Sequence, residues 1–255
     1  MGTLLRALLA AAAFAGYAAP RPAAADLATV AVAANFLPAL ETLERDFERG
    51  GAHTLALVPG STGQLYAQIA NGAPFDVLLA ADQETVAKLV ADGRADGGTR
   101  FTYAVGTLVL FTRDTTKFKP LTLDSLRRTD FRWLAIANPD LAPYGLAAQQ
   151  TLATLGLWQP LQAKLVRGQS IAQTFALAET RNADLAFVAL SQAIAYRAPA
   201  AYVPVPDELH APLRQDAVLL AHGRGNAAAL ALLDYLRGPV AAKTLADFGY
   251  RPGAP

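Results

Sequence analysis

LATVAVAANFLPALETLERDF, residues 27–47, joins a strand pattern to a helix pattern. Its first seven residues form a short apolar run, which is typical of a strand buried on both faces of a parallel sheet. In its second part Leu40, Leu43 and Phe47 recur at helical spacing, and Asn35 precedes them where an N-cap is expected. The stretch therefore predicts one strand–helix unit of an α/β fold.

The same alternation continues along the chain. Further helices are predicted to start at Ser61, Asp82, Ser170 and Asn226, because each of these capping side chains precedes a helical pattern. Further apolar runs predict strands at Thr54–Val58, Asp76–Ala80, Tyr103–Phe111, Trp133–Ala137, Leu185–Ala189 and Ala217–Ala221. The order of these features predicts two α/β lobes with mostly parallel sheets.

The boundaries of the two lobes follow from the order of the predicted elements. We expect residues 26–103 and 215–255 to form lobe 1 and residues 104–214 to form lobe 2. The long run Tyr103–Phe111 is then a strand that crosses between the lobes, and the C-terminal helices return to lobe 1.

Residues 1–25 have the features of a secretory signal peptide. Arg6 precedes an apolar run from Ala7 to Ala15, and small residues lead to Ala25. We expect cleavage after Ala25 and release into the periplasm. Because the sequence contains no cysteine, thiolate catalysis and disulfides are excluded, and we expect no cysteine-linked lipid anchor.

The charge of the expected mature chain is close to neutral. The sequence has 22 Lys and Arg against 21 Asp and Glu, and Arg6 and Arg21 lie in the leader, so residues 26–255 hold 20 basic and 21 acidic side chains. This balance argues against nucleic acid as a partner, because nucleic-acid binding requires a basic face.

Four loops combine hydrogen-bond donors with an absence of basic residues. Three of them follow a predicted strand, and the fourth contains the start of the helix predicted at Ser170. Ligands of open α/β sheets bind at such junctions, which face helix N-termini that attract anions. The loops are Ala33–Phe36, Pro59–Gly63, Asn138–Gly145 and Gly168–Ile171. Taken singly, each loop is also explained by ordinary helix capping. Together they favour an oxyanion held by neutral donors.

Several short motifs resemble the periplasmic molybdate-binding proteins. The motifs occur in order over essentially all of residues 26–255. They are Ala33-Ala-Asn-Phe36, Gly60-Ser-Thr-Gly63, Asn71-Gly-Ala-Pro-Phe-Asp-Val77, Ala80-Ala-Asp82, Asn138-Pro139 with Ala142-Pro-Tyr-Gly145, Phe187-Val-Ala-Leu190 and Tyr235-Leu-Arg-Gly-Pro239.

This resemblance implies a type II periplasmic-binding-protein fold whose two lobes, joined by crossover strands, close on molybdate or tungstate for an ABC importer. It implies a monomer that docks on a membrane permease, with no cofactor, no cation ligands and no catalytic residues. The implied ligand-binding residues are Ala34, Asn35, Ser61, Thr62, Tyr144 and Ile171. Some members carry a ligand-binding Tyr where this chain has Ala189, which leaves open whether the Tyr144 hydroxyl contacts the anion.

Three other functions compete with this hypothesis. A binder of another anion, such as sulfate or a carboxylate, shares the fold, and a carboxylate binder needs an Arg such as Arg167 in the cleft. An exported hydrolase is disfavoured because Gly60-Ser-Thr-Gly63 lacks the Gly-x-Ser-x-Gly pattern and no histidine lies in the four loops. A transcriptional effector domain needs a DNA-binding segment where the chain has a leader.

Overall fold

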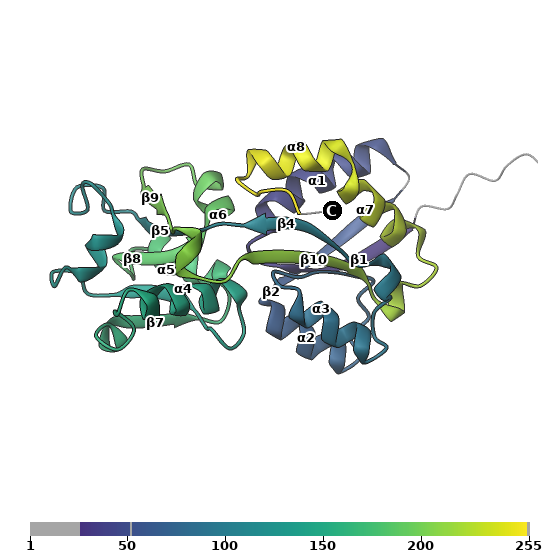
Figure 1. Ribbon diagram of the computed structural model, residues 1–255. Helices are drawn as coiled ribbons and strands as arrows, with labels where there is room; N and C mark the ends of the chain where they lie inside the picture. Colours follow the sequence, from purple (N-terminus) through teal and green to yellow (C-terminus); the bar gives the residue numbers. More distant parts are fainter. Residues whose placement is uncertain (1–25, 52, 254–255) are drawn as a thin grey trace, which may run out of the picture.

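Two five-stranded sheets form the centres of two lobes (Figure 1). The computed structural model describes residues 26–51 and 53–253, so the predicted signal peptide lies outside the described residues. The first sheet has the order β2-β1-β3-β10-β4, with β1 (Leu27–Ala33), β2 (Thr54–Gly60), β3 (Val77–Leu79), β4 (Phe101–Gly106) and β10 (Leu213–Leu219). The second has the order β7-β6-β8-β5-β9, with β5 (Leu108–Thr112), β6 (Leu134–Ala137), β7 (Leu165–Gly168), β8 (Leu185–Ala189) and β9 (Ala201–Pro204).

Both sheets are mixed. In the first, β1 pairs in parallel with β2 and β3, whereas β10 pairs antiparallel with β3 and β4. In the second, β6 pairs in parallel with β7 and β8, whereas β5 pairs antiparallel with β8 and β9. The two α/β lobes are therefore confirmed, but the sheets are less parallel than predicted. In the first sheet the reason is that the chain leaves along β4 and returns beside it along β10.

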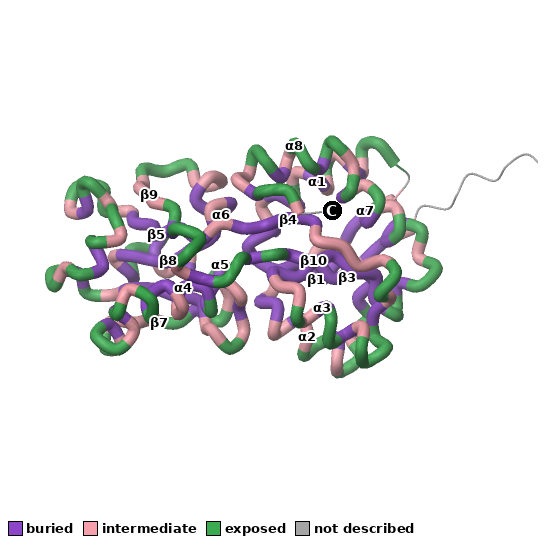
Figure 2. Tube along the Cα trace, in the orientation of Figure 1, coloured by how far each residue is buried: buried purple, intermediate pink, exposed green. Residues whose placement is uncertain are grey.

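Helices cover both faces of each sheet. In the first lobe α1 (Leu37–Gly50), α7 (Ala227–Arg237) and α8 (Pro239–Asp247) enclose one apolar core, and α2 (Thr62–Ala70) and α3 (Glu84–Ala91) enclose the other. In the second lobe α4 (Pro143–Thr154) covers one face, while α5 (Ile171–Glu179) and α6 (Leu190–Ala195) cover the opposite one. Short 3-10 helices lie at Gly97–Thr99, Leu123–Arg127, Gln162–Lys164, Asp207–Leu209 and Ala221–Gly223. Figure 2 shows the strands buried and the outer helix faces exposed.

The crossing strand is divided at Thr107. The predicted run Tyr103–Phe111 forms β4 in the first sheet and β5 in the second. A side chain at Gly106 would collide with the Tyr144 hydroxyl, so the crossing point requires glycine. We propose that the lobes divide at this crossing and where the chain re-enters the first sheet at Leu213, near the predicted limits.

Strand β10 begins earlier than predicted. Gln215 and Asp216 interrupt the apolar pattern before Ala217, yet both are buried in the strand. Their side chains are satisfied there, since Asp216 accepts hydrogen bonds from Arg100 and Thr102. Burying a polar side chain costs little free energy when it is hydrogen-bonded. A search for continuous apolar runs therefore misses these two residues of the strand.

The helix caps agree with the sequence at α2, α5 and α7 but not at α1 or α3. Gln83, not the predicted Asp82, is the N-cap of α3 and makes no side-chain cap, although Asp82 accepts the Thr85 N–H. Ser61, Ser170 and Asn226 are the N-caps of α2, α5 and α7, each accepting a backbone N–H of the first turn. The prediction that Asn35 caps α1 is wrong, because Phe36 occupies that position and makes no side-chain cap. Among the described residues, no helix has the length and apolar character of a membrane span.

Candidate ligand-binding site

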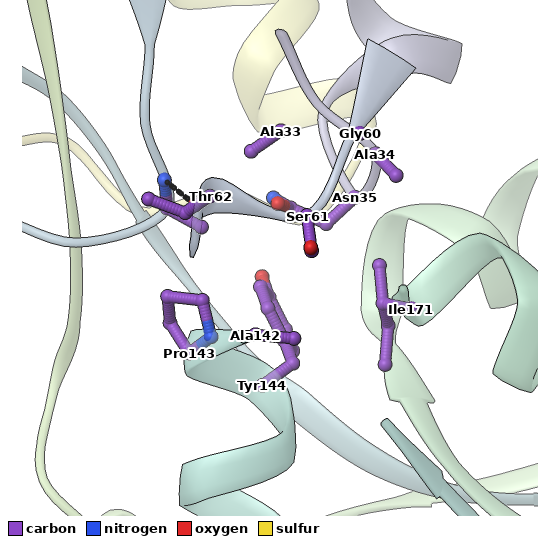
Figure 3. A pocket seen from close by; sticks show the side chains of 11 residues that line it. Ala33, Ala34, Asn35, Gly60, Ser61, Thr62, Ala142, Pro143, Tyr144 and Ile171 are labelled. Carbon is purple, nitrogen blue, oxygen red and sulfur yellow. Dashed lines mark hydrogen bonds between the residues drawn. The ribbon is translucent and has the colours of Figure 1, made fainter. Parts of the chain in front are cut away.

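A small cavity lies where the two lobes meet. Its empty volume is about 200 Å³, counting the part that opens to solvent. Loops of the first lobe form one wall, and the start of α4 and Ile171 of α5 form the other (Figure 3). The lining residues are Ala33, Ala34, Asn35, Gly60, Ser61, Thr62, Ala81, Ala142, Pro143, Tyr144 and Ile171.

All six residues expected at the site line this one cavity. The four donor-rich loops, far apart in sequence, therefore converge at one place. Arg167 does not belong to the lining: it is exposed on β7, with its guanidinium 5.9 Å from the centre of the Trp158 ring. Ala189, which the resemblance related to a tyrosine position, also lies outside the lining.

Two hydroxyl groups come from the loop between β2 and α2. The Ser61 hydroxyl faces the cavity in Figure 3 and accepts only a long bond, 3.4 Å, from the Gln64 N–H. The Thr62 hydroxyl accepts from the Ala81 N–H at 3.0 Å. Because a hydroxyl can donate while it accepts, both groups keep a proton for a ligand.

Backbone N–H groups add to these donors. Thr62, Tyr144 and Ile171 lie in the first turns of α2, α4 and α5, where N–H groups have no intrahelical acceptor. The N–H of Asn35 finds no acceptor within residues 26–51 and 53–253. The N–H of Ala34 differs, since it donates to the Gly60 carbonyl at 2.9 Å, so Ala34 contributes only wall.

The side chain of Asn35 is turned away from the cap position and is engaged in the protein. Its Nδ2 donates to Gln215 Oε1 at 2.8 Å and to the Tyr250 hydroxyl at 3.1 Å. An amide nitrogen carries two protons, so both are committed. Asn35 therefore offers the cavity its main-chain N–H rather than its amide group.

The Tyr144 hydroxyl lies at the junction of the lobes. It accepts a hydrogen bond from Gln215 Nε2 at 3.4 Å, and it rests against Gly106 at the crossing point. Burial raises the pKa of the Tyr144 phenol well above its usual value, so the hydroxyl keeps its proton at any physiological pH.

The electrostatic character of the cavity is set by dipoles. Among the described residues, those that line it include no Lys, Arg, Asp, Glu or His. The N-termini of α2, α4 and α5 all reach it, and a helix N-terminus carries a partial positive charge. Within the described chain, no group of three His, Asp or Glu is arranged for a metal cation. The donors and dipoles suit an anion.

The lobes are in direct contact around the cavity. The Gly63 N–H of α2 donates to the Leu141 carbonyl of the opposite lobe at 2.9 Å. A Cβ on Gly63 would lie 3.0 Å from that oxygen, which is tighter than normal packing. Ala34 and Ala81 pack in the same apolar cluster as Tyr144 and Ile171. The described arrangement is thus a closed one.

A second layer of polar side chains supports the cavity. Gln215 and Tyr250 hold Asn35, and Ser191 donates to the Asn35 carbonyl at 2.7 Å. Gln192 Nε2 donates to the Ile171 carbonyl at 3.2 Å. None of these residues was found from the sequence, because each lies far along the chain from the loop that it supports.

A family model described as bacterial extracellular solute-binding protein matches residues 28–251. The chain belongs to this family. The fold and the interlobe cavity thus occur in a solute-binding protein, and the protein class predicted from the sequence is confirmed.

Individual relatives of the chain give more specific information about the ligand class. The chain is 46% identical over 229 residues to the molybdate-binding protein ModA of Azotobacter vinelandii, covering 87% of this chain and 88% of the relative. It is 42% identical over 232 residues to ModA of Rhodobacter capsulatus, covering 90% of each. A solved Azotobacter vinelandii periplasmic molybdate-binding protein superposes with a TM-score of 0.83 at 36% identity, covering 89% of this chain and 100% of that one. The resemblance stated from the motifs is confirmed.

Proposed function

We propose that this solute-binding protein captures molybdate, and tungstate as its close analogue, in the interlobe cavity and delivers it to an ABC importer. The observation that carries the proposal is the set of neutral donors on both walls of a cavity without charged lining residues. The similarity to proteins named for molybdate supports the choice of anion.

The donors are assigned as follows. Ser61 and Thr62 donate their hydroxyls, and Asn35, Thr62, Tyr144 and Ile171 donate main-chain N–H groups, which together replace the hydration shell of a dianion. A hydrogen bond to a charged group contributes about 1.5–3 kcal/mol, so several of them outweigh the costs of binding and closure. Ala34 shapes the wall, and the Tyr144 hydroxyl is a further donor near the lobe junction.

Selectivity rests on protonation and size. Every assigned group donates, so a fully deprotonated oxyanion is satisfied, whereas the O–H of hydrogen phosphate meets another donor. Sulfate carries the same charge and shape as molybdate, so only cavity size separates the two. We expect sulfate to fit too loosely.

The cellular setting follows from the family and the leader. We assign residues 1–25 as a signal peptide cleaved after Ala25, and we infer that the protein acts as a monomer in the periplasm. The oxyanion is cargo rather than a cofactor, and the protein binds it without chemical conversion. The partner is a membrane permease, and nucleic acid is not a ligand.

Calorimetric titration of the dialysed protein with molybdate, tungstate, sulfate and phosphate tests the assignment. We expect submicromolar binding of the first two anions and no heat from the others. Equal affinity for sulfate would keep the anion site and overturn the selectivity. Absence of heat from all four would reduce the loops to helix caps.

A further inference from the structure

A buried polar triangle joins the lobes next to the cavity. The Asn35 carbonyl accepts hydrogen bonds from the Ser191 hydroxyl at 2.7 Å and from the Tyr250 hydroxyl at 2.8 Å. The two hydroxyl oxygens are 3.1 Å apart. The three residues are 1%, 2% and 5% exposed, so water does not compete for these groups.

The triangle draws on both lobes. Asn35 and Tyr250 belong to the first lobe, with the Tyr250 ring packed edge-on against Phe36 at 5.6 Å. Ser191 comes from α6 of the second lobe. Gly249, at a φ of +77°, lets the chain turn against Leu190, the residue before Ser191. The Ser191 bond therefore exists only while the lobes touch.

The side chain of Asn35 is also hydrogen-bonded within the protein. Asn35 Nδ2 donates to Tyr250 and to Gln215, and Gln215 donates in turn to Tyr144 across the lobe junction. Asn35 Nδ2 and the Asn35 carbonyl are thus engaged, whereas the Asn35 N–H, at the cavity lining, finds no acceptor among the described residues.

We infer that Ser191 and Tyr250 form a closure latch on the Asn35 carbonyl. The latch positions the Asn35 N–H for the bound oxyanion and holds the lobes together after closure, so that it slows release. This inference rests on the proposed function. Ser191 and Tyr250 are positioning residues, because they act through Asn35 without lining the cavity.

Two variants with matched controls test the latch. Ser191→Ala removes the bond between lobes, and Tyr250→Phe removes one hydroxyl while keeping the ring. Ser125→Ala is the serine control, since Ser125 is buried and bonded to Thr122 in the second lobe alone. Tyr235→Phe is the tyrosine control, because the Tyr235 hydroxyl is buried and finds no partner among the described residues.

Molybdate affinity, dissociation rate and thermal midpoint of the ligand-free protein are measured for all five proteins. We expect each latch variant to bind molybdate about 3- to 10-fold more weakly, which is the range that one hydrogen bond supplies. The loss of affinity should come from a faster dissociation rate. We expect the ligand-free midpoint of Ser191→Ala to fall by no more than that of the Ser125→Ala control. Wild-type affinity in Ser191→Ala, or an equal loss of affinity in Ser125→Ala, overturns the latch.

Failure of the proposed function is recognised separately, because the wild type would then bind no oxyanion. The latch is in that case judged by small-angle scattering of the ligand-free proteins. It predicts a larger radius of gyration for the Ser191→Ala/Tyr250→Phe double variant than for the wild type. An equal radius overturns it.

Discussion

Most hydrogen-bond donors of this cavity are main-chain N–H groups, which are available because of where a residue lies rather than which residue it is. Thr62, Tyr144 and Ile171 offer N–H groups because each lies at the start of a helix, and almost any residue could supply that atom. Ser61 is different, since its hydroxyl both caps α2 and faces the cavity. Side-chain substitutions at Ser61 and Thr62 are therefore the ones that report on binding.

Ser61→Ala is expected to weaken molybdate binding about 10- to 100-fold, because one hydrogen bond to a charged ligand is lost. Loss of the cap also lowers the free energy of unfolding by about 1 kcal/mol. Asn226→Ala is the control: it removes the cap of α7, far from the cavity, and we expect a similar loss of stability at unchanged affinity. Calorimetry and urea unfolding distinguish the two effects, and equal affinity losses would remove Ser61 from the site.

Gly63→Ala is expected to lower affinity without lowering the stability of the ligand-free protein. The added Cβ presses on the Leu141 carbonyl only when the lobes close. In the open form alanine favours the helix by up to about 1 kcal/mol relative to glycine. The measurement is the molybdate dissociation constant beside the ligand-free thermal midpoint; wild-type affinity would show that closure tolerates the methyl group.

The sequence predicted the residues whose chemistry is local. Ser61 and Ser170 were identified as caps from their own neighbours in the chain, and the cavity loops from theirs. Gln215, Ser191 and Tyr250 carried no such signal, because each lies 156 or more residues from Asn35, which it contacts. The wrong cap at Asn35 has the same origin, since distant Gln215 and Tyr250 compete for its amide.

At the scale of elements, helix N-termini position the N–H donors, and edge strands are the elements that the sequence pattern predicts least well. Strands β7 and β9 were missed. β7 is four residues long and includes the exposed Arg167, and β9 lies at the edge of its sheet with Tyr202 exposed. Short edge strands bury too little apolar surface to produce a continuous run. The longer central strands β1 and β8 were predicted with their observed limits.

Asp82, which precedes α3, gives this part of the fold a pH dependence. Burial raises the pKa of its carboxyl, partly offset by hydrogen bonds from Thr85. The folded state thus binds the proton more tightly than the unfolded one, so the carboxylate costs stability above its folded pKa. This cost shrinks as the pH falls below the folded pKa and is gone below the ordinary aspartate pKa of the unfolded chain.

Asp82→Asn keeps a side-chain oxygen for the Thr85 N–H and removes the buried charge. We expect the variant to be more stable than the wild type at neutral pH, with the difference shrinking as the solution is acidified toward the ordinary aspartate pKa. Thermal unfolding at several pH values measures it. A difference that is independent of pH would contradict the assignment.

At the scale of the whole molecule, an anion is expected to bind without help from net charge. Residues 26–255 are nearly neutral, and no charged side chain lines the cavity among the described residues. Two lobes and an interlobe site could be predicted from the sequence, because the loop chemistry and motif order span the chain. The mixed sheets could not, because strand direction depends on where the chain re-enters.

The affinity for molybdate is therefore expected to depend weakly on salt. Raising NaCl from about 0.05 to 0.5 M shortens the Debye length several-fold, yet it does not screen short hydrogen bonds in a closed site. We expect the dissociation constant to change less than about threefold, measured by calorimetry in a series of NaCl concentrations. A tenfold weakening would reveal a cationic side chain that contributes to capture.

The strand order β2-β1-β3-β10-β4 also bears on how the protein is made. β10 lies between β3 and β4, although about 107 residues separate Gly106 from Leu213 along the chain. A ribosome releases the chain from its N-terminus, so the first sheet lacks an interior strand until Leu219 has emerged. Under the proposed export, the N-terminal part meets the export machinery before its sheet is complete, which is the condition that threading across a membrane requires.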